Sequence, residues 1–300
     1  MESPRLVPAT ELERETGLGK DLLRKWRERY GFPTSENQSN GALGYSREQV
    51  LQLRSIKRLL DLGFRPGQVV GKSIAELDCL LGALSGNGVA PLRNSATREA
   101  IERLKQHKLE GLKALLGKER AKGSLTDFVV NVVAPLVVAV GESWAQGEIE
   151  VYHEHICSDE LIRCLHAELR ALKPKQGFPR IMFATPPDEI HVLGLLMAEA
   201  VLADQGANCI SVGPQIAMGE LAMAVQACDA NIVAMSFSFA YPARRVRPTL
   251  EHLRELLPSS IEIWAGGAGV SHIQRPPKGV LVFGNLQAVM SELMQRVQLV

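Results

Sequence analysis

The sequence predicts a multidomain protein that is α-helical in its first two blocks and α/β in its third. Helical signals follow one another up to about residue 172 without a strand between them. From Arg180 onward, short apolar runs alternate with helical stretches, as strands and crossover helices do in a doubly wound parallel sheet. Segments rich in Gly, Asn, Pro and Lys separate the three blocks, at residues 85–91 and 173–177.

Length and composition indicate a globular protein. The chain has 300 residues, enough for about two domains of roughly 150 residues each. Lys and Arg total 34 against 33 Asp and Glu, and 46% of the residues are hydrophobic. These values exclude a disordered chain and one whose whole surface binds phosphate, but they allow a basic patch in one part of the molecule.

We expect neither a membrane span nor export. The longest apolar run, residues 128–140, is interrupted by Asn131 and Pro135 and is too short to cross a bilayer. The N-terminus lacks the apolar stretch of a signal peptide. The five cysteines are scattered and form no CxxC pair. A reduced cytoplasmic protein fits this pattern.

The first block predicts a helix-turn-helix. A Thr10–Glu13 capping box opens a short helix, and the glycines of residues 17–19 provide a tight turn. A second helix spans residues 20–30, a polar loop or small hairpin covers 32–45, and a Ser46–Gln49 capping box opens an amphipathic helix over 46–62. A helix, a glycine turn and a basic helix are the elements of this motif.

The second helix is basic. It carries five cations against two acids, a local charge of +3; the cations are Lys20, Arg24, Lys25, Arg27 and Arg29. Cations at this position of a helix-turn-helix can contact DNA phosphates and groove edges. On charge alone, an ordinary solvated helix face explains the pattern equally well.

The local sequence favours DNA binding. Residues 23–31 contain Trp-x-x-Arg-Tyr-Gly, Gly44-Tyr45-Ser46 precedes the next helix, and Leu-Gly-Phe follows it at 62–64. These residues resemble the MerR-type winged-helix domain, in the version found in the CarH- and LitR-like light-responsive repressors. The resemblance implies that residues 1–75 bind double-stranded operator DNA through the basic helix and Tyr45 of the wing. Where that subgroup has Arg or His just before the wing's Tyr-Ser, this chain has Gly41-Ala42-Leu43-Gly44, so its wing is short of cations.

The second block, within residues 92–172, predicts a four-helix bundle. Its helical stretches lie near 97–107, 109–117, 124–145 and 151–172. In the third block, residues 178–300, five runs suit buried strands: 181–185, 209–212, 232–237, 261–264 and 280–283. The helices between and after them fall near 191–205, 218–228, 243–257 and 286–298.

Three short motifs follow three of these strands. They are Glu189-Ile-His191-Val-Leu-Gly194, then Ser236-Phe-Ser238, then Gly266-Gly267. The carboxyl ends of parallel strands border the ligand crevice of an open sheet, so the motifs should lie at one edge. A lone histidine there is more often a loop or cap residue. The set of three, in this order and spacing, is what makes the pattern specific.

The set resembles the cobalamin-binding module of methionine synthase and the methylmalonyl mutases, a Rossmann-like domain. The resemblance implies that His191 is the lower cobalt ligand, in place of the cofactor's own dimethylbenzimidazole. It also implies that the displaced nucleotide tail runs past Gly194, Ser236, Ser238, Gly266 and Gly267. Glu189 stands where that family more often has Asp. A carboxylate there can accept the other ring N–H of the histidine and fix its tautomer.

A further motif lies in the helical block. Trp144 is followed after nine residues by Glu154-His155. In isolation, such a Trp is usually a core residue and such a Glu-His pair a surface one. Before a cobalamin module, however, the spacing resembles the cap of CarH-like photoreceptors, where these side chains surround the adenosyl group. His153 is expected to face solvent. In that family a histidine follows the cap tryptophan and ligates cobalt after light, whereas this chain has Ala145.

Together, the resemblances imply a cytoplasmic, adenosylcobalamin-dependent repressor that responds to light. It would assemble as a homo-oligomer, a tetramer in the best-known members, and it would not be an enzyme. A cobalamin-dependent methyltransferase or mutase needs a substrate barrel of about 250 residues, for which this chain has no room. The alternative is a DNA-binding regulator that senses another ligand, or none, through a degenerate cobalamin-like domain. The colour of the purified protein separates the two.

Overall fold

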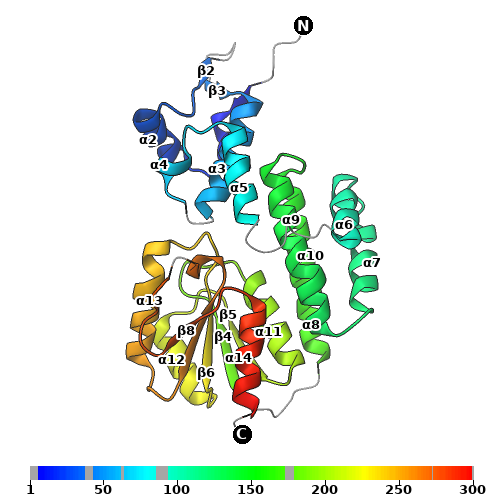
Figure 1. The fold of residues 1–300 in the computed structure, drawn as a ribbon, viewed down its shortest axis with the longest axis vertical. Coiled ribbons are helices and arrows are strands. Elements are labelled where there is room, and N and C mark those ends of the chain that lie inside the picture. The colour runs from blue at the N-terminus through cyan, green and yellow to red at the C-terminus, as the bar shows by residue number, and fades with distance from the viewer. Residues whose placement is uncertain are drawn as a thin grey trace. The chain divides into compact units, whose positions relative to one another are not determined.

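The structure is a computed structural model that describes residues 6–37, 43–61, 64–85, 94–172, 179–271 and 273–298. The predicted linker at 173–177 lies outside the described residues, and so does the linker at 85–91 except for Ser85. Four residues of the MerR-like motifs also lie outside them: Gly41, Ala42, Leu62 and Gly63. The chain forms two compact units. The first contains residues 1–108 and 136–157, and the second contains residues 109–135 and 158–300. The predicted helical block therefore contributes helices to both units (Figure 1).

The N-terminal part of the first unit is a winged helix. Its elements are β1 (Val7–Pro8), α1 (Ala9–Thr16), α2 (Lys20–Tyr30), β2 (Glu36–Asn37), β3 (Leu43–Tyr45), α3 (Arg47–Asp61), α4 (Pro66–Val69) and α5 (Ile74–Ser85). The three strands form an antiparallel sheet in the order β1-β3-β2, which confirms the expected hairpin. Helices α1 and α2 end at Gly17 and Gly31, with φ of 67° and 71°. This left-handed conformation suits glycine, which has no Cβ.

One of the two predicted N-terminal caps is absent from the structure. Helix α1 begins one residue before Thr10, and the side chain of Glu13 accepts the backbone N–H of Lys20 at 2.7 Å, so the predicted capping box does not form. Ser46 does accept the N–H of Gln49, at 3.2 Å. Helix α5 lies mostly beyond residue 75, and its Leu77 is fully buried in the winged-helix core.

The helical block contains α6 (Ser95–Lys105), α7 (Leu109–Arg120), α8 (Leu125–Phe128), α9 (Ala134–Ala145) and α10 (Val151–Ala171). A π-helical turn at Val129–Val133 joins α8 to α9, so the predicted helix 124–145 is continuous but locally widened. Pro135 explains the widening, because it lacks the N–H that would donate to residue 131.

The stretch Leu125–Ala145 is, among the described helices, the one long and apolar enough to cross a membrane by length and composition. Half of its most apolar window is buried within the protein, and the core helix of a globular protein meets the same criteria.

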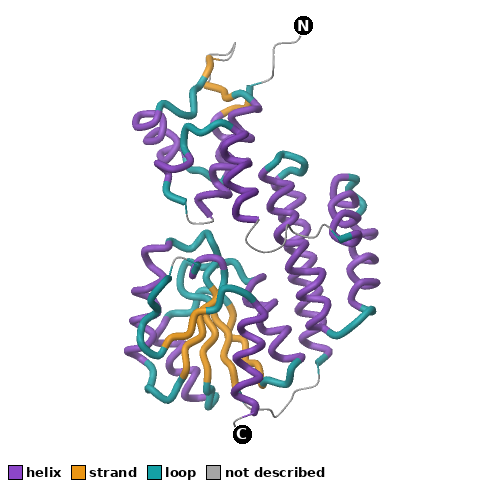
Figure 2. The backbone as a smooth tube through the Cα atoms, in the orientation of Figure 1, coloured by secondary structure: helices purple, strands orange, loops and turns teal. Residues whose placement is uncertain are grey.

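The second unit contains a five-stranded parallel sheet. Its strands are β4 (Arg180–Ala184), β5 (Asn208–Gly213), β6 (Ile232–Ser236), β7 (Glu262–Gly266) and β8 (Val280–Val282), in the order β5-β4-β6-β7-β8. Helices α12 (Met218–Ala227) and α13 (Ala243–Leu256) cover one face, and α11 (Leu193–Asp204) and α14 (Leu286–Gln298) cover the other (Figures 1 and 2). The predicted doubly wound sheet is confirmed.

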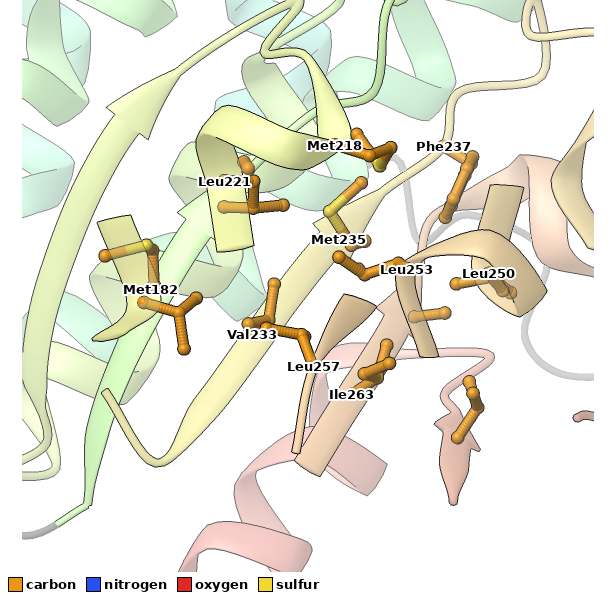
Figure 3. Close-up of a cluster of buried hydrophobic side chains, with 14 of the residues drawn as sticks. Met182, Met218, Leu221, Val233, Met235, Phe237, Leu250, Leu253, Leu257 and Ile263 are labelled. Carbon is orange, nitrogen blue, oxygen red and sulfur yellow. The ribbon is translucent and has the colours of Figure 1, made fainter. Parts of the chain in front are cut away.

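One hydrophobic cluster of this unit lies between the sheet and helices α12 and α13. Figure 3 shows Met182, Val233 and Ile263 of three neighbouring strands facing Leu221 of α12 and Leu253 of α13. All five side chains are at most 1% exposed. Strand β4 has β5 as its neighbour on one side and β6 as its neighbour on the other. The carboxyl ends of β4 and β6 therefore border the switch point, where open α/β sheets bind ligands.

Candidate functional site

The loop after β4 and the loop after β6 meet at this switch point. His191 lies in the first loop and Ser238 in the second, and the Ser238 hydroxyl is 3.2 Å from His191 Nδ1. His191 is half exposed at its side chain, whereas Glu189, two residues earlier, is 1% exposed. The sequence-predicted residues of the crevice are thus brought together by the topology of the sheet.

Glu189 connects the two loops. One carboxylate oxygen, Oε1, lies 2.7 Å from His191 Nδ1 and also accepts the backbone N–H of His191 at 2.9 Å. The other oxygen, Oε2, accepts the backbone N–H of Ser238 at 2.8 Å. The extra methylene of Glu, compared with Asp, therefore does not prevent the expected contact with the histidine ring.

The electrostatics of the pair fix the histidine tautomer. Burial by itself raises the pKa of Glu189, but the hydrogen bonds from His191 and Ser238 outweigh burial, and the pKa lies below its ordinary value. An ionised Glu189 accepts a proton-bearing Nδ1, and in a neutral imidazole the lone pair then resides on Nε2. Nε2 of His191 is therefore the nitrogen suited to binding a metal.

Thr185 shapes the His191 loop, a role that the sequence motifs did not reveal. Its buried hydroxyl donates to the Glu189 carbonyl oxygen at 2.6 Å and accepts the N–H of Gln215 at 3.0 Å. Asp188 has a positive φ of 68°, and its carboxylate forms an ion pair with Arg245 of α13 at 2.9 Å. In the sequence, these two residues could have been found as a Thr directly after the predicted strand and an Asp directly before the Glu-x-His motif.

Glycines allow the loops after β6 and β7 to approach each other closely. Gly267 has φ of 94°, and a Cβ there would lie 2.3 Å from the carbonyl oxygen of Phe237. A Cβ on Gly269, which the motifs did not include, would lie 2.4 Å from the carbonyl oxygen of Ser238. Gly194 faces Ser236, because a Cβ on this glycine would lie 3.5 Å from the hydroxyl oxygen of that serine. Gly266 ends β7 in register with Ser236.

The cap residues belong to the first unit. Trp144 lies at the end of α9, and its indole Nε1 is buried without a hydrogen-bond partner. Glu154 and His155 lie in the first turns of α10, where Glu154 Oε2 is 2.8 Å from Nδ1 of His155, whose side chain is 73% exposed. Ala145, directly after the tryptophan, is buried.

The expectation that His153 faces solvent is wrong. His153 is 6% exposed, and its ring stacks on His107 with 5.2 Å between centroids. Its Nδ1 accepts the backbone N–H of Glu150 at 3.0 Å. Burial, followed by the nearby charge of His107, lowers the pKa of His153. The residue therefore braces the start of α10, because its ring caps a free N–H there.

Most cations of helix α2 that we predict to contact DNA have exposed side chains. Lys20, Arg24, Lys25 and Arg29 are exposed. Arg27 differs, because its guanidinium donates to the Pro33 carbonyl oxygen at 3.2 Å and to the Tyr45 hydroxyl at 2.5 Å. Tyr45 is 3% exposed. Arg27 and Tyr45 thus fasten the wing to α2, which positions the exposed cations beside them.

Two family models match parts of the chain. A family model described as MerR HTH family regulatory protein matches residues 8–71, and one described as B12 binding domain matches residues 97–167. The chain thus joins a MerR helix-turn-helix domain to a B12-binding domain. It is 27% identical over 273 residues to the HTH-type transcriptional repressor CarH of Myxococcus xanthus, with 88% of each protein covered.

About two thirds of the chain resemble a solved corrinoid protein in fold. The monomethylamine corrinoid protein of Methanosarcina barkeri superimposes with a TM-score of 0.56 at 14% identity, covering 68% of this chain and 99% of that protein. This part of the chain therefore shares the fold of that protein.

Proposed function

We propose that this protein is an adenosylcobalamin-dependent transcriptional repressor whose binding to operator DNA is controlled by light. The observation that carries the proposal is the buried Glu189 holding Nδ1 of a half-exposed His191 at the switch point of the sheet. The same chain carries an exposed basic helix of MerR type. Similarity to the CarH repressor along most of the chain supports the link between the two.

The residues at the crevice fit a corrinoid. An imidazole nitrogen is a suitable ligand for a transition metal, and a carboxylate on the other ring nitrogen increases its basicity. Among the described residues, no cluster of three or more His, Cys, Asp or Glu is arranged to hold a bare metal ion. His191 would bind cobalt, while Ser236, Ser238 and Gly194 would line the path of the nucleotide tail, with Gly266 and Gly267 beside them.

The cap residues would recognise the adenosyl group. Trp144 offers a flat apolar surface with an unpartnered N–H, and the Glu154–His155 pair offers polar groups for ribose hydroxyls and adenine. When bound, the cofactor supplies a cobalt–carbon bond that light can cleave. The protein's part would be to supply the histidine ligand to cobalt and the apolar and polar groups that recognise the adenosyl group.

On the DNA side, the exposed cations of α2 would contact phosphates and the major groove. One winged helix binds weakly, so we expect a homo-oligomer in which several copies bind one operator together. Loss of the adenosyl group would weaken that assembly and release the DNA. We expect the protein to act in the cytoplasm as a regulator and not as an enzyme.

The test combines a spectrum with DNA binding. The full-length protein is loaded with adenosylcobalamin in the dark, and its absorption spectrum and its affinity for DNA selected from a random pool are recorded before and after green light. We expect bound cobalamin in the dark, a spectral change on illumination and a loss of DNA affinity. A protein that takes up no cobalamin supports a regulator of another ligand. If the protein takes up cobalamin but light leaves its DNA affinity unchanged, the proposed light response is wrong.

A further inference from the structure

One face of helix α3 contacts the turn between α9 and α10. Arg47, Leu51, Arg54 and Arg58 are spaced by four, three and four residues, so they share one stripe of the helix. This stripe faces residues 141–150, which we call the α9–α10 turn. A Cβ on Gly147 would lie 2.2 Å from Cδ2 of Leu51, and one on Gly141 would lie 3.2 Å from Nη1 of Arg58. All of these residues belong to the first unit.

Four charged side chains form a cluster at the centre of this contact. Nη2 of Arg54 lies 2.8 Å from Glu15 Oε2 and 2.7 Å from Glu150 Oε2. Arg47 bridges the same two carboxylates, with 2.7 Å to each. Glu15 lies on α1, whereas Glu150 directly precedes α10. We call these four residues the ion cluster.

Arg54 is the buried member of the ion cluster. Its side chain is 0% exposed, and Nη1 donates to the Ile149 carbonyl oxygen at 3.5 Å. Its guanidinium carbon also lies 5.8 Å from the centre of the Trp144 ring. A buried cation needs its carboxylate partners, because water cannot replace them. Arg54 therefore ties the winged helix to the cap tryptophan and to Glu150, the residue that directly precedes α10.

Glu150 is the member of the ion cluster that lies outside the winged helix, so its ion pairs can break while those inside the winged helix remain. Burial raises its pKa, but the hydrogen bond and charge of Arg54, together with Arg47, outweigh burial, and its pKa lies below the ordinary value. Glu150 is thus ionised at neutral pH. If its contacts open, Arg47 and Arg54 keep Glu15 as a partner within the winged helix itself. Opening of the Glu150 contacts would therefore leave both arginines paired with Glu15.

We propose that the ion cluster couples the cap residues to the DNA-binding domain, with Arg54 as the positioning residue between Trp144 and α3. Displacement of the cap residues moves the α9–α10 turn and opens the Glu150 contacts, which changes how firmly the winged helix is held. The exposed cations of α2 lie on another helix and stay accessible in the closed form. This inference rests on the proposed function, because it assumes that ligand and light act on the cap.

The test uses Glu150→Gln in the full-length protein, with Glu148→Gln as a matched control. Glu148 lies in the same turn but pairs with Lys105 of α6 at 3.3 Å and with the hydroxyl of Ser143. Arg47→Gln serves as a second variant, because Arg47 is 46% exposed and its loss leaves Arg54 paired. Hydrogen exchange of the α9–α10 turn is measured without cofactor. The ratio of DNA affinities before and after green light is measured with adenosylcobalamin.

We expect Glu150→Gln and Arg47→Gln to speed exchange in the turn and to reduce the dark-to-light affinity ratio at least about fivefold, the lower end of usual allosteric coupling. Glu148→Gln should leave the ratio as in the wild type. Unchanged exchange shows that the cluster does not hold the turn, and faster exchange with an unchanged ratio shows a purely structural role. Either result overturns the inference. A wild type without any light effect refutes the proposed function instead, while the exchange measurement still tests the cluster.

Discussion

Glu199 of α11 is a buried acid whose charge should destabilise the α/β unit at neutral and higher pH. The residue is 8% exposed, and its Oε2 has no hydrogen-bond partner. Burial raises the pKa of Glu199 from 4.5 to about 7, against a smaller opposing effect of the Ser211 hydrogen bond. We predict that Glu199→Gln, which removes the charge and keeps the shape, stabilises this unit at pH 8.

The sign and size follow from proton linkage. Because the folded state binds the Glu199 proton more tightly than the unfolded state, this residue favours folding below pH 4.5. That contribution is lost as the pH rises through about 7. The difference between the two pKa values corresponds to about 3 kcal/mol when the pH is above both. Between pH 5 and pH 8, the wild type should lose about 2 to 3 kcal/mol of unfolding free energy that the Gln variant does not lose.

The assay unfolds the protein in urea at pH 5, 6, 7 and 8. Unfolding is monitored by pulse-labelling hydrogen exchange of the β6 amides. Strand β6 is buried along its whole length, so its amides report unfolding of the α/β unit. Glu220→Gln, at an exposed position of α12, is the matched control and should follow the wild type. Parallel pH profiles for the wild type and Glu199→Gln would refute the reasoning, because a neutral or solvated Glu199 produces no difference.

Three further predictions concern the candidate sites. His191→Ala should abolish the histidine-ligated spectrum of bound cobalamin, and an unchanged spectrum and affinity would remove His191 from the cobalt site. Arg24→Glu should weaken operator binding and reduce its salt dependence by a slope of roughly one, without changing cofactor uptake; Arg24 is the better choice than Arg27, which fastens the wing. Ala145 has no lone pair to donate to cobalt after light, unlike the histidine of the family. The spectrum of the photoproduct should therefore respond to pH and to added imidazole. A pH-insensitive spectrum that is lost in His155→Ala would instead assign that residue as the light-state ligand.

Local sequence determined the elements and the motifs. Apolar runs of strand length alternate with helices after residue 180, and all five predicted strands are present. This alternation also predicts a parallel sheet, whereas the strand order β5-β4-β6-β7-β8 is decided by the tertiary structure. The contact between Glu189 and His191 was also predictable, because a carboxylate two residues from an imidazole in one loop can reach its nearer nitrogen.

Tertiary structure decided which side chains are buried, and therefore which are free to bind. Arg54 looks like a surface cation on an amphipathic helix, yet it is fully buried, because carboxylates 39 and 96 residues away meet it. His153 precedes a polar Glu-His pair but lies under His107. Arg27 donates to the hydroxyl of Tyr45, whose side chain is buried. Each outcome depends on partners distant in the chain, whose approach is set by packing and leaves no periodic trace in the sequence.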